Sequence, residues 1–323
     1  MPHILIIKTS SLGDVVHNLP IVADIRARWP NAVIDWVVEE SFAEIPALHP
    51  QVRQVIPVAT RRWRRTLFRP ATWREMREFR RELRRQNYDL VLDTQGLLKS
   101  AVIAWLARGP SYGQDKYCAR EPLAARLYDH VFAVASGRHA VERNRDLAAQ
   151  AMKYPLPTTP PDYGIRPPAE PSPVNLPGNY AVCLHGSSRD SKLWPERHWI
   201  DFAAGLVAAG ITPILPWGNA REEQRARSIA TAVKQAHVPP KLSLRQLAVM
   251  MGQARAVVGV DTGLVHLAAA LNCPAVAIYL DSSPLLTGVL PANPARAVNL
   301  GGAGELPSPD DVRHALARLG VTA

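Results

Sequence analysis

The chain has 323 residues, of which 47% are hydrophobic and 20% are charged, and its formal net charge is +10. This composition excludes a disordered chain, and the length exceeds that of a single hydrophobic core, so we expect two domains. The three cysteines have neither CxxC nor Cys/His ligand spacing, which argues against a disulfide framework and predicts no metal site.

The N-terminal apolar run has no basic segment before it and no cleavage site after it, so we interpret it as a first strand rather than a signal peptide. No stretch approaches the roughly 18 apolar residues that a membrane-spanning helix needs. We therefore expect a cytoplasmic protein.

The first half of the chain alternates apolar strands with helical segments. A strand from His3 to Lys8 precedes a helical pattern from Val15 to Arg28, and further strands follow at Val33 to Val38, Val52 to Val58 and Leu90 to Asp93. This alternation is typical of a doubly wound parallel α/β domain, which we place at residues 1–160.

A proline-rich segment between Tyr154 and Pro177 sustains neither helix nor central strand, and we place an interdomain linker at residues 161–178. The remainder, 179–323, predicts a second α/β domain, and we leave open that its last helix packs back on the first. Its strands are expected at Tyr180 to Leu184, Ile211 to Leu215, Ala256 to Val260 and Ala275 to Tyr279. Two such domains facing each other would form a cleft at the carboxyl ends of their strands.

The positive charge is concentrated in the first half. Residues 1–160 carry 24 Lys/Arg and 16 Asp/Glu, which indicates an anionic partner for this half. Four arginines surround Trp63 with no acid among them, and Arg forks suit phosphates and carboxylates. These are Arg61, Arg62, Arg64 and Arg65, to which Arg120 and Arg143 add. The Arg/Glu-rich helix from Trp73 to Arg85 is better interpreted as a solvated, ion-paired face.

Directly after the first strand, the segment from Lys8 to Asp14 combines Ser, Gly and Asp before a helix. Its backbone N–H groups would suit an anion, and Asp14 would suit a general base acting on a hydroxyl. The alternative is that Asp14 merely caps the helix.

The second half repeats this arrangement twice. The segment from His185 to Pro195 offers Ser187, Ser188 and Lys192 to a diphosphate, although the GxxxxGK[ST] and GxGxxG patterns are absent from the chain. The segment after Val260 offers Asp261 to sugar hydroxyls and backbone amides to a phosphate. These amides belong to Thr262, Gly263 and Leu264. A helix cap at Asp261 and a packing role for His266 are the alternatives.

Taken together, these segments resemble the lipopolysaccharide heptosyltransferase family, closest to the branch that adds the first heptose. The resemblance covers nearly the whole chain, through KTSSLGDVVHNLP, DWVVEESFAEIP, VIPVATRRWRR, QGLLKSA, AREPLA, HAVER, HGSSRDSKLWP, LPWG and VDTGLVHLAAAL. It implies a glycosyltransferase B-type fold with an N-terminal acceptor domain and a C-terminal nucleotide-sugar domain.

The resemblance also implies the reaction. An inverting, metal-independent transfer moves L-glycero-D-manno-heptose from ADP-heptose onto the 3-deoxy-octulosonate of lipid A, without a cofactor, at the cytoplasmic face of the inner membrane. Three alternatives stay open: a sister enzyme that adds the second heptose, a nucleic-acid-binding protein that uses the RRWRR surface, and a sugar-nucleotide epimerase. We expect no nucleic acid as a partner, because the two anion loops would then have no purpose.

By position, the resemblance implies that Asp14 is the general base and that Lys192 assists the leaving group. It implies donor binding by Ser187, Ser188, Lys192, Glu222, Asp261, Thr262, Gly263, Leu264 and His266, and acceptor binding by Ser10, Gly13, Arg61, Arg62, Arg64 and Arg120. One departure is the segment Leu280 to Ser283, where the family commonly has Gly-Pro-Thr.

Overall fold

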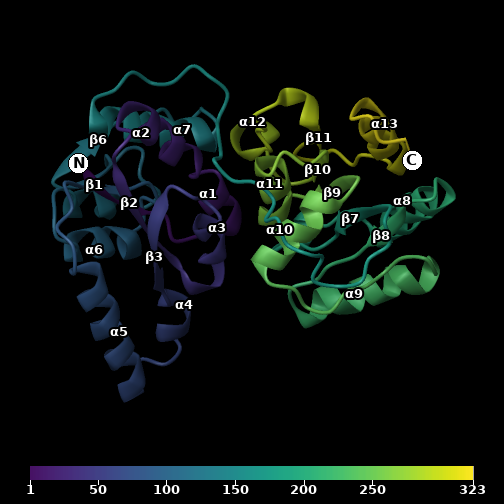
Figure 1. Cartoon of the computed structure of the whole chain (residues 1–323), viewed down its shortest axis with the longest axis horizontal. Helices are drawn as coiled ribbons and strands as arrows, with labels where there is room; N and C mark the ends of the chain where they lie inside the picture. The colour runs from purple at the N-terminus through teal and green to yellow at the C-terminus, as the bar shows by residue number, and fades with distance from the viewer. Residues whose placement is uncertain (323) are drawn as a thin grey trace. The chain divides into compact units, whose positions relative to one another are not determined.

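The computed structural model describes residues 1–322 and divides into two compact units (Figure 1). The N-terminal unit ends at Gly164 and the C-terminal unit begins at Ile165. This division falls within the proline-rich segment. In the described part of the chain, no helix has both the length and the apolar character needed to cross a bilayer.

The N-terminal unit is built on a six-stranded sheet in which every pair of neighbours is parallel, in the order β3-β2-β1-β4-β5-β6. The strands are β1 (His3–Ile7), β2 (Val33–Glu39), β3 (Val52–Val58), β4 (Leu90–Asp93), β5 (Ser111–Gln114) and β6 (His130–Phe132). The helices are α1 (Leu12–Val16), α2 (Pro20–Arg28), α3 (Glu44–Ala47), α4 (Thr60–Trp63), α5 (Pro70–Leu83), α6 (Leu98–Leu106) and α7 (Ala140–Met152), with short 3-10 turns at Glu40–Phe42 and Pro122–Leu127.

This strand order reverses direction between β1 and β4, so the loops that leave these two strands diverge to opposite faces of the sheet. Ligands of doubly wound sheets bind at such a point. The expected helix from Val15 to Arg28 is wrong in one respect, because it is two helices, α1 and α2. Pro20 lacks an N–H group and therefore begins α2 rather than continuing α1.

The C-terminal unit has a five-stranded parallel sheet in the order β11-β10-β9-β7-β8. Its strands are β7 (Tyr180–Leu184), β8 (Thr212–Ile214), β9 (Ala256–Val260), β10 (Ala275–Tyr279) and β11 (Ala297–Gly301). Its helices are α8 (Glu196–Ala208), α9 (Ala220–Ala232), α10 (Leu244–Gln253), α11 (Gly263–Ala270), α12 (Pro284–Thr287) and α13 (Pro309–Arg318), with 3-10 turns at Asp190–Lys192 and Pro294–Arg296. Here the order reverses between β7 and β9.

The largest buried cluster of the C-terminal unit packs against one face of its sheet, since alternate residues of β7, β9 and β10 contribute to it. Trp194, Trp199 and Phe202 are fully buried and meet edge to face, and α13 adds Val312 and Leu316 to the same cluster. The last helix therefore belongs to the core of the C-terminal unit. The expectation of two doubly wound α/β domains is confirmed.

Candidate functional site

In the N-terminal unit, the loops after β1 and β4 are held together by a buried lysine. The Lys8 side chain is 6% exposed, and its Nζ donates to the Thr94 carbonyl oxygen at 2.7 Å and to Asn144 Oδ1 at 3.5 Å. Burial lowers the pKa of Lys8 to about 8, while the nearby carboxylate of Asp14 opposes this shift. Lys8 therefore joins the loop after β1 to the loop after β4 and to α7.

Asp14 lies in the first turn of α1, where its carboxylate has two kinds of partner. Oδ2 accepts from the Ser11 N–H at 2.9 Å and from the Ser11 hydroxyl at 3.0 Å, and Oδ1 accepts from Arg120 at 3.3 Å. Burial raises the pKa of Asp14, but Lys8, Arg120 and the Ser11 hydrogen bonds outweigh it, so the pKa lies below its usual value. Asp14 therefore caps the helix with one oxygen and presents the other toward Arg120.

A small cavity, here called the Asp14 cavity, lies beside this carboxylate. Its lining brings three cationic side chains around the one carboxylate, a balance that favours an anionic group. The lining residues are Lys8, Asp14, Thr94, Gln95, Gln114, Cys118, Arg120, Ala140, Arg143 and Asn144.

The residues predicted to bind the acceptor lie in different surroundings. Ser10 is buried, its N–H donates to Gln95 Oε1 at 3.1 Å, and its hydroxyl accepts from Lys99 at 2.9 Å. Gly13 lies half-buried in α1. Of the four arginines predicted for the acceptor, only Arg120 lines the Asp14 cavity.

No acid lies within the run of arginines around Trp63, as the sequence shows, but acids from outside the run bind Arg62. Its guanidinium donates to Glu75 at 2.8 Å and to Glu40 at 3.0 Å, and Trp63 Nε1 also donates to Glu75 at 2.8 Å. These acids come from distant parts of the sequence, so the local run of basic residues could not reveal them.

Arg61 and Arg64, the nearest arginines on either side of Arg62, have different surroundings. The Arg61 guanidinium lies over the Phe42 ring at 5.2 Å. Arg64 is exposed, and within residues 1–322 it forms no ion pair. Arg64 is therefore the more available of these charges to an anionic ligand.

In the C-terminal unit, Asp261 is the centre of a polar cluster at the switch point. Its Oδ2 accepts from Lys192 Nζ at 2.6 Å and from the Ser282 hydroxyl at 2.6 Å, and His266 Nε2 lies 3.7 Å from Oδ1. The Ser187 hydroxyl donates to the main-chain oxygen of Asp261 at 2.9 Å. Burial raises the pKa of Asp261, but His266, Lys192 and Ser282 together hold it well below its usual range.

Directly after Asp261, the chain enters α11. Thr262 is the N-cap residue and Gly263 begins the helix, followed by Leu264. The first amides of a helix have no intrahelical acceptor and carry partial positive charge, so this end of α11 suits a phosphate beside Lys192. His266 is buried on this helix and faces Asp261, so it is more than a packing residue.

Glu222 lies close to the loop that leaves β7. Asn219 caps α9 by accepting from the Glu222 N–H at 3.1 Å, and Glu222 Oε2 accepts from the Gly218 N–H at 2.7 Å. A Cβ atom at Gly186 would approach Glu222 Cδ to 2.7 Å, so a larger residue there would displace the Glu222 side chain. Ser188 lies exposed on the same loop.

Comparison with protein families shows which family the chain belongs to. The family described as glycosyltransferase family 9 (heptosyltransferase) matches residues 76–314. The chain belongs to this family. The lipopolysaccharide heptosyltransferase 1 of Pseudomonas aeruginosa is 47% identical over 88% of this chain and 80% of its own length. The lipopolysaccharide heptosyltransferase 2 of Salmonella typhimurium is 25% identical over 92% of this chain and 88% of its own length.

Two solved structures of one family member resemble this chain closely. The E. coli heptosyltransferase WaaC with ADP has 42% sequence identity and a TM-score of 0.88, covering 98% of this chain and 99% of that chain. The structure of WaaC with ADP-2-deoxy-2-fluoro heptose has 41% identity and a TM-score of 0.85 over the same shares. The resemblance to the heptosyltransferases drawn from the sequence is confirmed, as is the glycosyltransferase B-type fold.

The sequence predicted that Asp14, Lys192 and Asp261 lie at the switch points of this chain. It did not predict the side chains that bind or surround them. Lys8 and Asn144 in the N-terminal unit were not assigned. Ser282 was missed as well, although it lies in the segment that departs from the family pattern. Its position could have indicated this contact. Leu280 to Ser283 follows β10, Asp261 follows β9, and these two strands are neighbours in the sheet.

Proposed function

We propose that this family 9 enzyme moves L-glycero-D-manno-heptose from ADP-heptose onto the 3-deoxy-octulosonate of lipid A, with inversion at the anomeric carbon. The observation that carries the proposal is the Asp261 cluster, where a carboxylate, Lys192 and the N-terminal end of α11 adjoin one another. This combination suits a sugar diphosphate, because the carboxylate accepts from sugar hydroxyls while the cation and amides hold phosphate.

On the donor side, departure of ADP places negative charge on the β-phosphate. Lys192 and the amides of Thr262, Gly263 and Leu264 would stabilise this charge without reorganisation. Asp261 would hold the heptose, Ser187 and Ser188 the diphosphate, and Glu222 the adenosine ribose.

On the acceptor side, Asp14 would take the proton from the attacking hydroxyl of the 3-deoxy-octulosonate. The hydroxyl oxygen then bonds to the anomeric carbon from the face opposite to ADP, while the bond between that carbon and the β-phosphate oxygen breaks. Lys8 and Arg120 support this role, because they keep the carboxylate ionised at neutral pH. Arg61, Arg62, Arg64 and Arg120 would face the acidic groups of the acceptor.

The proposal needs neither a metal ion nor a cofactor, since side chains and helix amides supply the positive charge. It places the enzyme in the cytoplasm at the inner leaflet of the membrane that carries lipid A. Negative charge on that leaflet would attract the basic N-terminal unit.

Metal-free turnover tests the proposal. The purified protein is incubated with EDTA, ADP-heptose and lipid A bearing 3-deoxy-octulosonate, and both ADP release and acceptor mass are followed. We expect the acceptor to gain one heptose, and we expect Asp14→Asn to lower kcat about 10²–10⁴-fold. The control Asp201→Asn removes an exposed carboxylate on α8 and should leave the rate unchanged.

Transfer only onto an acceptor that already carries heptose would assign the second-heptose reaction instead. Loss of turnover in EDTA that added Mg²⁺ restores would contradict the metal-free mechanism. Full activity of Asp14→Asn would remove Asp14 from the role of base.

A further inference from the structure

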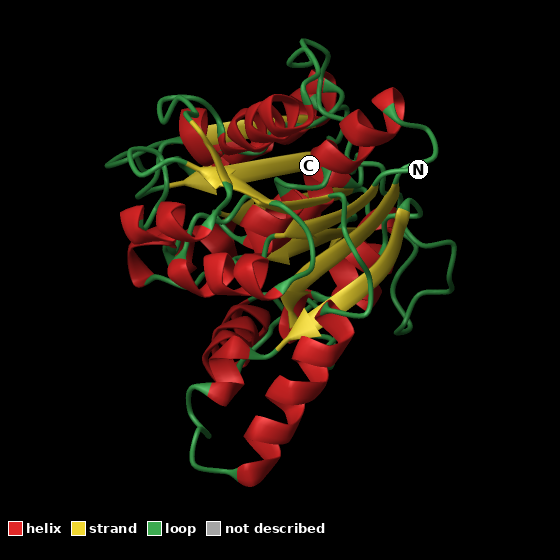
Figure 2. Cartoon of the chain, turned by 90° about the vertical axis from the view of Figure 1, so that its left-hand side faces the viewer, coloured by secondary structure: helices red, strands yellow, loops and turns green. Residues whose placement is uncertain are grey.

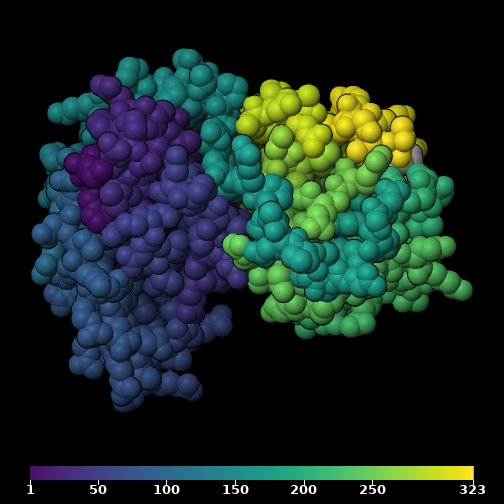
Figure 3. Space-filling model, in the orientation of Figure 1, coloured from purple at the N-terminus to yellow at the C-terminus, as the bar shows by residue number. Residues whose placement is uncertain are grey.

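Helices α4 and α5 and the loop between them form an arm that projects from the rest of the N-terminal unit (Figures 1 and 2). Large apolar side chains lie exposed near its end. Phe68 is fully exposed, Leu67 is 42% exposed and Trp73 is 54% exposed. The space-filling view shows the same segment as a protruding end of the unit (Figure 3). Three large apolar side chains at the end of an arm indicate contact with an apolar partner.

The exposure of these side chains is built into the arm. The Thr72 hydroxyl donates to the Thr66 carbonyl at 2.7 Å, and Trp73 Nε1 donates to the Leu67 carbonyl at 2.8 Å. The Arg69 N–H closes the turn by donating to the Thr66 carbonyl at 3.0 Å. These bonds hold the loop in a conformation that leaves its apolar side chains exposed.

Beyond the apolar tip formed by Leu67, Phe68 and Trp73, the side chains of α5 lie in different surroundings on its different faces. Met76, Phe79 and Leu83 pack into the core of the unit. Two of the three glutamates are bound by neighbouring elements, Glu75 by α4 and Glu82 by Gln54 of β3 at 2.7 Å. The arginines occupy the remaining surface.

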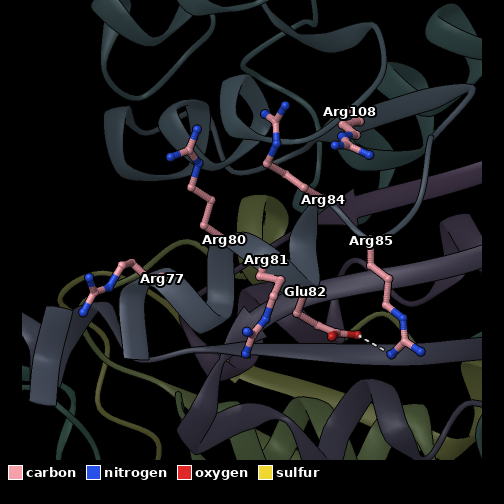
Figure 4. Close-up of a pocket in the computed structure, with 7 residues that line it drawn as sticks. All are labelled: Arg77, Arg80, Arg81, Glu82, Arg84, Arg85 and Arg108. Carbon is pink, nitrogen blue, oxygen red and sulfur yellow. Dashed lines mark ion pairs between the residues drawn. The ribbon is translucent and has the colours of Figure 1, made fainter. Parts of the chain in front are cut away.

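The interpretation of this helix as a solvated face is confirmed, but its ion pairing is wrong, because these arginines are largely free of acidic partners. Within residues 1–322, Arg74, Arg77, Arg80 and Arg81 form no ion pair, and Arg85 lies 3.7 Å from Glu82. Figure 4 shows the pocket that the arginines of α5 from Arg77 onward form with Arg108, which follows α6 in the chain. Its lining is Arg77, Arg80, Arg81, Glu82, Arg84, Arg85 and Arg108.

The charge of the chain is concentrated on this arm. Residues 61–85 contain eleven arginines and three glutamates, which accounts for most of the formal net charge of +10. An apolar end followed by a basic helix matches the two layers of an anionic bilayer, acyl chains below and phosphates above. A nucleic acid strand fits less well, because it needs a groove that follows its backbone rather than an apolar wedge at the end of an arm.

We propose that the α4–α5 arm anchors the enzyme on an anionic lipid bilayer, with Leu67, Phe68 and Trp73 entering the headgroup region and the α5 arginines binding lipid phosphates. This inference rests on the proposed function in one respect, namely that the acceptor is held in a membrane. The tip and the α5 arginines would hold the Asp14 cavity near that surface, whereas Arg61 and Arg62 of α4 would face the acceptor.

Flotation with vesicles tests the anchor. Wild type should float with vesicles of phosphatidylethanolamine and phosphatidylglycerol and remain behind with phosphatidylcholine alone. The tip variant Leu67→Ser/Phe68→Ser should weaken binding about tenfold or more. The charge variant Arg74→Ser/Arg77→Ser/Arg81→Ser should weaken it roughly 100-fold. The matched control places serine at three exposed basic residues of the C-terminal unit, Arg197, Lys234 and Lys241, and should bind as wild type does.

Quenching of tryptophan fluorescence tests separately whether the tip of the arm enters the bilayer. Brominated acyl chains should quench part of the tryptophan fluorescence of wild type, and Trp73→Phe should lose that part. Equal flotation of all variants, or quenching unchanged in Trp73→Phe, would overturn the proposal. So would retention by a single-stranded RNA oligonucleotide in place of vesicles.

A water-soluble acceptor that lacks acyl chains separates this inference from the proposed function. We expect the tip and charge variants to transfer heptose to it at the wild-type rate, which also shows that they are folded. Lack of transfer by wild type would contradict the proposed function while leaving the flotation result to judge the anchor.

Discussion

Replacing Lys8 by Met tests how burial of a charge governs the N-terminal site. The pKa of Lys8 is about 8 in the folded chain against an ordinary 10.5, so between these pH values the unfolded chain binds a proton that the folded chain does not. Stability must therefore rise as the pH rises through this window. The shift of about 2.5 pH units corresponds to about 3 kcal/mol, and Lys8→Met removes this dependence.

Urea unfolding of both proteins at several pH values between 7 and 10.5 provides the measurement. The free energy of unfolding of wild type minus that of Lys8→Met cancels the titration of tyrosines and other lysines. This difference should increase by about 3 kcal/mol as the pH rises, because wild type becomes more stable. A difference that stays flat, or that moves against wild type, would refute the assignment of a buried and readily deprotonated Lys8.

The same variant should alter the reaction. Lys8 lowers the pKa of Asp14, so its removal should move the acid limb of the kcat/KM profile to higher pH. An unchanged acid limb would show that Lys8 does not act on the base. Arg120 would then be the main charge on Asp14.

Three further predictions concern donor binding and stability. Ser282→Ala removes a 2.6 Å hydrogen bond to Asp261 and should raise the KM for ADP-heptose about tenfold with a smaller change in kcat, and an unchanged KM would exclude the Leu280–Ser283 segment from the donor site. Gly186→Ala places a Cβ atom against Glu222 and should also raise the donor KM roughly tenfold, leaving the acceptor KM as a built-in control. Arg145→Leu leaves its buried carboxylate partner on α2 unpaired and should destabilise the protein by about 3–5 kcal/mol in urea, whereas a loss below 1 kcal/mol would contradict a buried pair.

The position of the candidate polar cluster in each unit could be predicted from the sequence because the signals were local. Each polar segment directly follows an apolar strand, as at Lys8 to Asp14 and at Asp261 to Leu264, and strand ends of parallel sheets meet at one edge. The short strands β5 and β6 were missed. Ser111–Gln114 and His130–Phe132 contain too few apolar residues in a row to be distinguished from loops.

The partners of charged groups could not be predicted in the same way. Arg62 binds Glu40 and Glu75, which lie 22 residues before it and 13 residues after it. Ser282 reaches Asp261 from 21 residues away, and Ser191 donates to Asp281 across 90 residues. Such contacts depend on which strands are neighbours in the sheet, and strand order has no local signal in the sequence.

Two carboxylates, Asp14 in the N-terminal unit and Asp261 in the C-terminal unit, illustrate why similar motifs suit different roles. Asp261 accepts on Oδ2 from a lysine and a serine, and His266 approaches Oδ1, so it is a poor proton acceptor and is better suited to recognition. Asp14 binds Ser11 through Oδ2 alone, and its Oδ1 has only a long contact with Arg120 beside a cavity. A general base needs an ionised oxygen within reach of a hydroxyl, and Oδ1 of Asp14 meets that need. The difference in hydrogen bonding, rather than the residue type, therefore favours Asp14 over Asp261 as the proposed base.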